Sequence, residues 1–255
     1  MPGVDRRRAS AAVALAAGPG GRGTVRAPST RATAWLLVAL AAVSGCIDVI
    51  CLTRLNGYFA SVITGNLVHL GQAIATADGR SLAGAVVAVG GYAAGVAGAT
   101  VPLRDTPPGW NRRTALVAAV EAVLLLGFTA GWSACSARPG YGFGLVLLGT
   151  ASVSSGIQSV ITVGAGVPGA STTYLTGSLT TLVRRRVVDP HRIADVGGLG
   201  RLAGLVVGAV LGAVVLRTAP TWAPVLASVL VITVITVAVV LTRRAVAAAD
   251  RGQWR

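Results

Sequence analysis

The sequence contains few charged residues and no lysine. Only 12% of its 255 positions are charged, 53% are hydrophobic, and the mean hydropathy is +0.72. Soluble domains carry about one-quarter charged residues. Long stretches lack Asp, Glu and Arg, and several reach the ~20 residues that cross a ~30 Å hydrocarbon core. The scarcity of charge therefore excludes an ordinary soluble domain and predicts a polytopic membrane protein in contact with the lipid bilayer.

Catalytic and metal-binding patterns are also missing. Cys46, Cys51 and Cys135 form no Cys-x-x-Cys pair, so they support neither a disulfide framework nor a zinc site. No Ser-His-Asp arrangement, Gly-x-Ser-x-Gly motif or His/Glu cluster with metal-ligand spacing is present. We expect no enzymatic activity, no metal and no cofactor, and interpret the cysteines as small buried apolar side chains.

The charges that are present are mostly arginines. All 22 basic residues are Arg, the net charge is +14, and most of them lie at the ends of apolar runs or in the tails. This placement is typical of the basic residues that orient membrane helices on the cytoplasmic side, with attraction to anionic lipid headgroups as a second effect. Because no basic surface is interleaved with aromatic residues, nucleic acid is not an expected partner.

The apolar runs predict an all-α transmembrane bundle of six long helices with two shorter polar helices. We expect a basic, disordered tail at 1–31, although a signal peptide or an over-long gene start stays open, a transmembrane domain at 32–244 and a C-terminal tail at 245–255. The long runs are 33–53, 82–103, 114–132, 141–163, 199–216 and 222–241, and the polar segments are 58–76 and 171–183.

The two polar segments carry related motifs, Thr64-Gly65-Asn66 and Thr176-Gly177-Ser178. Buried polar groups in a membrane are costly and usually face the bundle interior or an aqueous cavity. Paired helix breaks at corresponding positions of two halves indicate a transporter's binding site. We therefore hypothesise that the segments meet near the bilayer midplane and form a solute path. The alternative is that they hold helices together through hydrogen bonds.

Four further polar residues lie within apolar surroundings. Asp48 could bind a cation or carry a proton, and Gln158 is its neutral counterpart in the second half; the alternative for Asp48 is an ion pair with an arginine such as Arg54. His69 and Glu121 are weaker candidates. His69 could titrate near neutral pH but could equally be a structural hydrogen-bonding group.

An internal duplication is predicted, with repeat halves at about 32–134 and 140–244. The Thr-Gly motifs fall on each other at a nearly constant offset, and so do two rows of small residues at four-residue spacing. Such rows let helices approach closely in lipid. The predicted packing residues are Gly91, Gly95, Gly204, Gly208 and Gly212.

The number of spans depends on the two polar segments. If both segments cross the membrane, the protein has eight spans and its two halves have the same orientation. If both segments are re-entrant, it has six spans and its two halves are inverted relative to each other. Both arrangements place the N- and C-termini in the cytoplasm. We favour six spans, because residues 171–183 are short for a span at ~1.5 Å per residue.

The motifs resemble those of the YoaK-like family of bacterial membrane proteins, a domain of unknown function. The resemblance rests on Gly45-x-x-Asp48, Gly57-Tyr-Phe and Thr64-Gly65-Asn66, followed by Gly156-x-Gln158 and Thr173-Tyr-x-Thr176-Gly177, and covers about residues 33–242. It implies about six transmembrane helices in the family and no established activity. Ser178 stands where the first motif has Asn66.

The sequence thus predicts a multi-pass protein of the cytoplasmic membrane. The first hypothesis is a small-solute or ion transporter or channel with a polar path built on the two Thr-Gly segments. The second is a structural or partner-binding membrane subunit that does not transport. Association with further copies of the same chain stays open.

Overall fold

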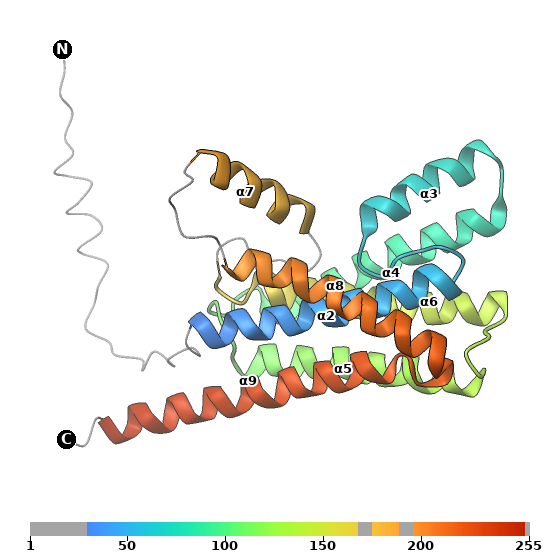
Figure 1. Ribbon diagram of the computed structural model, residues 1–255. Helices are drawn as coiled ribbons and strands as arrows, with labels where there is room; N and C mark the ends of the chain where they lie inside the picture. The colour runs from blue at the N-terminus through green and yellow to red at the C-terminus, as the bar shows by residue number, and fades with distance from the viewer. Residues whose placement is uncertain (1–29, 168–174, 189–195, 253–255) are drawn as a thin grey trace, which may run out of the picture.

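The computed structural model describes residues 30–167, 175–188 and 196–252, which form eight α-helices and no strand (Figure 1). The predicted N-terminal tail lies almost wholly outside these residues. Six of the described helices are long and apolar enough to cross a membrane, so the predicted fold class is confirmed. They are α2 (Thr30–Arg54), α4 (Gly79–Leu103), α5 (Arg112–Ala134), α6 (Tyr141–Val163), α8 (Val196–Thr218) and α9 (Val225–Gly252).

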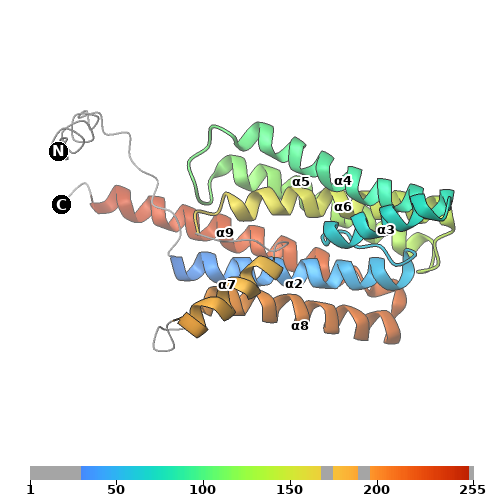
Figure 2. The same ribbon diagram turned by 90° about the horizontal axis from the view of Figure 1, so that it is seen from above.

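Two helices are shorter, α3 (Ile63–Ala75) and α7 (Leu175–Val188). α3 packs against α4, and α7 packs against α8. In Figures 1 and 2 the two short helices lie over different parts of the bundle, with their beginnings toward its middle and their ends diverging to opposite ends. The structure therefore does not bring α3 and α7 together as one packed pair.

Local sequence explains where several helices begin and end. The side chain of Asp78 accepts hydrogen bonds from the backbone N–H groups of Arg80 and Ser81, and thereby caps α4. Asn111 caps α5 in the same way. α9 continues to Gly252, well into the predicted C-terminal tail at 245–255, because the alanine-rich sequence after Arg244 favours helix.

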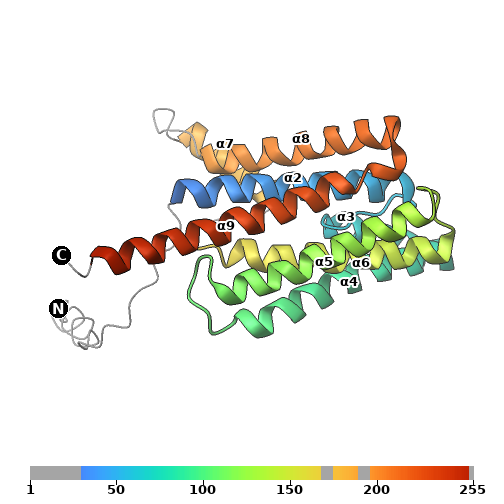
Figure 3. The ribbon, with the colours of Figure 1, turned by 90° about the horizontal axis from the view of Figure 1, so that it is seen from below.

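The six long helices alternate in direction and define two ends of the bundle (Figures 1 and 3). The arginine-rich end carries the start of α2 and the end of α9. At the opposite end, the hydroxyl of Tyr141 donates to the backbone oxygen of Arg80 over 2.8 Å, and the indole N–H of Trp132 donates to the backbone oxygen of Pro220 over 2.8 Å. The Asp78-Gly79-Arg80 turn therefore lies at the same end as the beginning of α6.

Glycines make the closest helix crossings possible. The most extensive packing is of α2 against α8 and of α4 against α6. A Cβ atom at Gly95 would overlap the backbone oxygen of Val153, and one at Gly208 would overlap that of Ala42. Backbones at this separation have no room for side chains, so van der Waals packing holds these helices together in lipid. The same crossings include Gly91, Gly204 and Gly212.

Candidate functional site

Asp48 fixes the chain between α2 and α3. Its carboxylate is buried and accepts hydrogen bonds from the backbone N–H of Ala60 at 2.8 Å, the backbone N–H of Ser61 at 2.9 Å and the Ser61 hydroxyl at 2.5 Å. Asp48 lies about 9 Å inside the end of α2, counted at ~1.5 Å per residue. The loop therefore turns back into the bundle before α3 begins.

Asn66 closes the same loop from the other side. Its side-chain oxygen accepts from the N–H of Phe59 at 3.0 Å, and its amide donates to the backbone oxygen of Phe59 at 2.7 Å. A Cβ atom on Gly65 would stand 3.3 Å from the Phe59 ring, whereas the side chain of Thr64 is exposed. In this motif, then, the asparagine binds the loop and the glycine leaves room for an aromatic ring.

Gln158 joins two helices. Its side-chain amide donates to the backbone oxygen of Leu40 at 2.8 Å and to the hydroxyl of Ser44 at 2.9 Å. Gln158 is on α6 and both of these partners are on α2. The buried amide therefore satisfies a backbone carbonyl across the bundle, which is the kind of interhelical hydrogen bond that supports packing in lipid.

The second Thr-Gly motif lies at the beginning of α7. Thr176 and Gly177 are exposed, and Ser178 is half-buried. A Cβ atom on Gly177 would meet no atom within 4 Å. These residues do not share the environment of Asn66, which is completely buried.

Glu121 is the most unusual buried group among the described residues. It is completely buried in α5, and neither carboxylate oxygen has a hydrogen-bond partner. α5 packs between α6 and α9. A carboxyl group without partners in such surroundings is strongly disfavoured in its charged form. Ionisable residues inside a membrane bundle commonly have functional roles.

His69, the other weaker candidate, contacts an aromatic ring. Its imidazole lies edge-on to the ring of Tyr58, with 5.5 Å between the ring centres. The Tyr58 hydroxyl in turn donates to the backbone oxygen of Ser81 at 2.8 Å. These contacts connect α3 to the beginning of α4, and they give His69 a packing role in the structure.

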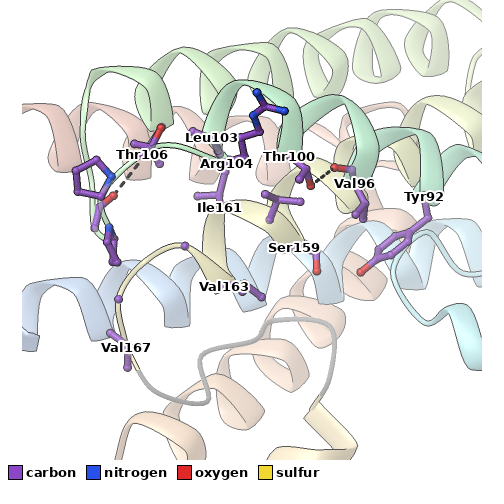
Figure 4. A pocket seen from close by; sticks show the side chains of 17 residues that line it. Tyr92, Val96, Thr100, Leu103, Arg104, Thr106, Ser159, Ile161, Val163 and Val167 are labelled. Atoms are coloured by element: carbon purple, nitrogen blue, oxygen red, sulfur yellow. Dashed lines mark hydrogen bonds between the residues drawn. The ribbon is translucent and has the colours of Figure 1, made fainter. Parts of the chain in front are cut away.

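A cavity of about 940 Å³ lies between α4 and α6 and extends to the loop that follows α4 (Figure 4). Its lining is largely apolar, and no acidic side chain contributes to it. In Figure 4 the hydroxyl groups of Tyr92 and Ser159 point toward the same side. The polar side chains that line the cavity are Tyr92, Thr100, Arg104, Thr106, Thr114 and Ser159.

This cavity is not lined by the residues predicted to form a path. Asp48, Asn66 and Gln158 direct their polar atoms to backbone and hydroxyl groups instead. Sequence reasoning missed Tyr92, which stands among apolar residues without a motif, and Ser159, which directly follows Gln158. The sequence does contain a partial signal for a polar surface on α6, because four of the five serines at 152, 154, 155, 159 and 171 lie on this helix.

A metal site is not indicated in the described part of the chain. No group of three or more His, Cys, Asp or Glu side chains lies close enough there to hold an ion. The cavity offers hydroxyl groups and one guanidinium. Such groups can bind an anion or a neutral polar solute by hydrogen bonding.

Comparison with known proteins gives a family and no activity. A family model described as "Protein of unknown function (DUF1275)" matches residues 36–238. The chain is 30% identical over 149 residues to the UPF0700 transmembrane protein YoaK of Bacillus subtilis (strain 168), a match that covers 58% of this chain and 64% of that protein. The aligned region thus spans less than two thirds of the relative. No solved structure matches the chain.

Proposed function

Since the chain belongs to the DUF1275 family of YoaK-like membrane proteins, whose activity is not established, we propose from the structure that it transports a small solute across the membrane. The observation that carries this proposal is the cavity of about 940 Å³ between α4 and α6. Ligand pockets for small molecules occupy about 300–1,000 Å³ and have mostly apolar walls with a few polar groups. The cavity has this character, and it lies between two helices long enough to span a bilayer.

The length of the cavity along α4 favours transport over binding at one membrane surface. Arg104 and Thr106 line it at the arginine-rich end, and Tyr92 lines it farther along α4. The distance along the helix from Arg104 to Tyr92 is about 18 Å at ~1.5 Å per residue. A solute at Tyr92 would therefore have passed more than half of a ~30 Å hydrocarbon core.

In this proposal neither Thr-Gly segment lines the path, and the first one supports it. Asp48 and Asn66 hold the loop between α2 and α3 at a fixed depth. Gln158 holds α6 against α2, next to Ser159 in the cavity wall. Rigid supports of this kind position a binding site more accurately than loops do.

The proposal includes two inverted repeat halves. In such a repeat, α2 of the first half corresponds to α6 of the second half, and α4 corresponds to α8. The packing of α2 against α8 then corresponds to the packing of α6 against α4. Gly45 packs against Leu205 of α8, and Gly156 packs against Tyr92 of α4 in the same manner. This correspondence supports a duplication, but it pairs Asp48 with Ser159 and not with Gln158. Inverted repeats are common in secondary transporters.

The orientation follows from the arginines. We place the arginine-rich end, with both termini, in the cytoplasm and the bundle in the cytoplasmic membrane, because basic residues concentrate on the cytoplasmic side. Only four arginines of the described residues, Arg54, Arg80, Arg138 and Arg217, lie at the opposite end. The cavity would then open to the cytoplasm in this conformation. The proposal assigns the chain no catalytic step.

One observation favours the second function, a partner-binding subunit that does not transport. α4 exposes small residues on the side away from α6, and Cβ atoms at Gly90 and Gly98 would meet no atom within 4 Å. A face of small residues would allow another membrane helix to approach closely. A copy of the same chain or a different membrane protein could use it.

Thiol labelling tests whether water reaches the cavity. A variant without Cys46, Cys51 and Cys135 would receive one cysteine, in place of either Ser159 or Val146. Both positions are on α6, but Val146 is exposed on the bundle surface and does not line the cavity. A small charged thiol reagent applied from the cytoplasmic side should modify the cysteine at 159 and not the one at 146.

A solute screen tests transport itself. Solutes that stabilise the purified protein against heat would be followed by uptake into proteoliposomes. A Ser159→Trp substitution, which places a bulky indole ring in the cavity, should abolish uptake while the protein stays folded. The proposal would be refuted if the cysteine at position 159 is not labelled and no stabilising solute is taken up. That result would favour the second function, a partner-binding subunit.

A further inference from the structure

A second cavity, of about 420 Å³, lies between the beginning of α5 and the second half of α9. Figure 3 shows these two helices side by side, with α9 continuing past the start of α5. The cavity is at the arginine-rich end, and it shares no lining residue with the cavity described above. It is lined by Trp110, Asn111, Arg112, Ala115, Leu116, Ile235, Val239, Thr242 and Arg243.

The polar part of this cavity has unused hydrogen-bond donors. The indole nitrogen of Trp110 is buried and has no hydrogen-bond partner. Arg112 and Arg243 come from different helices, both have exposed side chains, and neither forms an ion pair with another described residue. The side-chain oxygen of Asn111 already accepts hydrogen bonds from the N–H groups of Arg113 and Thr114 at the start of α5.

Apart from Thr242, whose hydroxyl donates to the backbone oxygen of Ala238 at 2.8 Å, the remainder of the lining is apolar and runs inward along the helices. Leu116, Ile235 and Val239 continue from the arginines toward the middle of the bundle. Leu116 is 58% exposed at the outer surface of the bundle, where lipid tails lie. No acidic side chain lines the cavity. A ligand that fits must therefore have an anionic head at the arginine-rich end and an apolar part that extends along α5 and α9.

We propose that this cavity binds an acidic glycerophospholipid, with its phosphate between Arg112 and Arg243 and one acyl chain against Leu116, Ile235 and Val239. Arginine binds phosphate through short, charge-assisted hydrogen bonds. The Trp110 N–H supplies a further donor, at the interface depth where tryptophan is enriched in membrane proteins. Basic pockets between transmembrane helices on the cytoplasmic side are established sites for acidic lipid headgroups. The proposal is independent of transport.

The test measures lipid retention and affinity with matched arginine variants. Purified protein in a neutral detergent would be titrated with phosphatidylglycerol or phosphatidylcholine, and bound lipid would be counted by native mass spectrometry. Arg112 and Arg243 would each be changed to Gln. The control is Arg113→Gln, because Arg113 is also exposed and is adjacent to Arg112 in sequence but does not line the cavity.

We expect phosphatidylglycerol to be retained and phosphatidylcholine to be lost. Arg112→Gln and Arg243→Gln should each weaken phosphatidylglycerol binding by about tenfold, which corresponds to ~1.4 kcal/mol, and Trp110→Phe should weaken it by a smaller factor. Arg113→Gln should leave binding within twofold of the unmodified protein.

Three results would overturn the proposal. Equal weakening by Arg113→Gln would show diffuse attraction to surface charge. Equal retention of phosphatidylcholine would show that the apolar groove alone selects the ligand. Displacement of phosphatidylglycerol by millimolar inorganic phosphate would identify a free anion as the natural occupant. Variants that unfold at the same temperature as the unmodified protein, without lipid, exclude misfolding as the cause.

Discussion

Replacement of Asp48 separates a structural role from an ion-binding one. Both backbone N–H groups, those of Ala60 and Ser61, donate to the same carboxylate oxygen, Oδ1. An asparagine keeps this acceptor, and its amide can donate to the Ser61 hydroxyl, which now bonds to Oδ2. Asp48→Asn should therefore leave the loop in place. Asp48→Ala removes the acceptor and leaves two buried N–H groups without a partner.

The expected loss in Asp48→Ala follows from those two donors. A buried donor without a partner costs about 1–3 kcal/mol, so the free energy of unfolding should fall by about 2–6 kcal/mol. With a shift of about 2–4 °C per kcal/mol for a chain of this size, the unfolding temperature should fall by at least about 4 °C. Asp48→Asn should stay within about 2 °C of the unmodified protein on the same scale.

Two native cysteines provide the assay. Cys46 and Cys51 are completely buried on α2, next to Asp48, so a fluorogenic thiol reagent reports their exposure as the protein in detergent is heated. Asp105→Ala is the control, because the Asp105 side chain is 76% exposed and its one ion pair among the described residues is with the neighbouring Arg104. Equal destabilisation by Asp48→Asn and Asp48→Ala would refute the hydrogen-bond argument and show that the negative charge itself is needed.

Three more predictions follow from single features of the fold. Gly208→Leu should prevent a stable bundle, because the new side chain would clash with the backbone of α2 at Ala42. Gly90→Leu should be tolerated, because a Cβ atom there meets no atom within 4 Å. Thermal unfolding of the two variants measures the difference. Glu121→Met should raise the free energy of unfolding by about 1–3 kcal/mol, since a carboxyl group without partners is removed from the interior, and a lower unfolding temperature would mean that the carboxyl has a stabilising partner. The pKa of Asp78 is lowered by its hydrogen bond from Ser81, so its capping contribution is present above the ordinary pKa of about 3.9 and is lost as the pH falls through the lower, folded value. The difference in unfolding temperature between the unmodified protein and Asp78→Ala should therefore vanish in strong acid. A difference that stays constant with pH would contradict the capping role.

The long helices could be predicted from the sequence because their signal is local. The run 141–163 coincides with α6 at both ends, and the other spans differ from prediction by a few residues, apart from the extension of α9 to Gly252. A membrane span is specified by its own composition and length. Proline and glycine at the ends of runs then fix the turns.

The interior of the site could not be predicted in the same way. The partners of Asp48 are backbone N–H groups twelve and thirteen residues ahead, in a loop whose return into the bundle has no sequence signature. The cavity depends on how α4 and α6 cross, which brings Tyr92 near Ser159 from positions far apart in the chain. The sequence identified Asp48, Asn66 and Gln158 as unusual, but only the fold shows that their polar atoms bond to the protein.

The pairing of α2 with α8 and of α4 with α6 has a consequence for the assembly of the protein at the ribosome. When the helices up to α5 have entered the bilayer, the surfaces with which α2 and α4 pack still face lipid, because α8 and α6 have not been synthesised. Until then lipid must cover both faces, and the early helices remain open to membrane proteases and to wrong neighbours. The α4–α6 packing therefore forms only after α6 has been inserted, and the α2–α8 packing only after α8 has been inserted. A chain cut between α5 and α6 should still assemble when both pieces are made together, because each piece carries the packing surface that the other lacks.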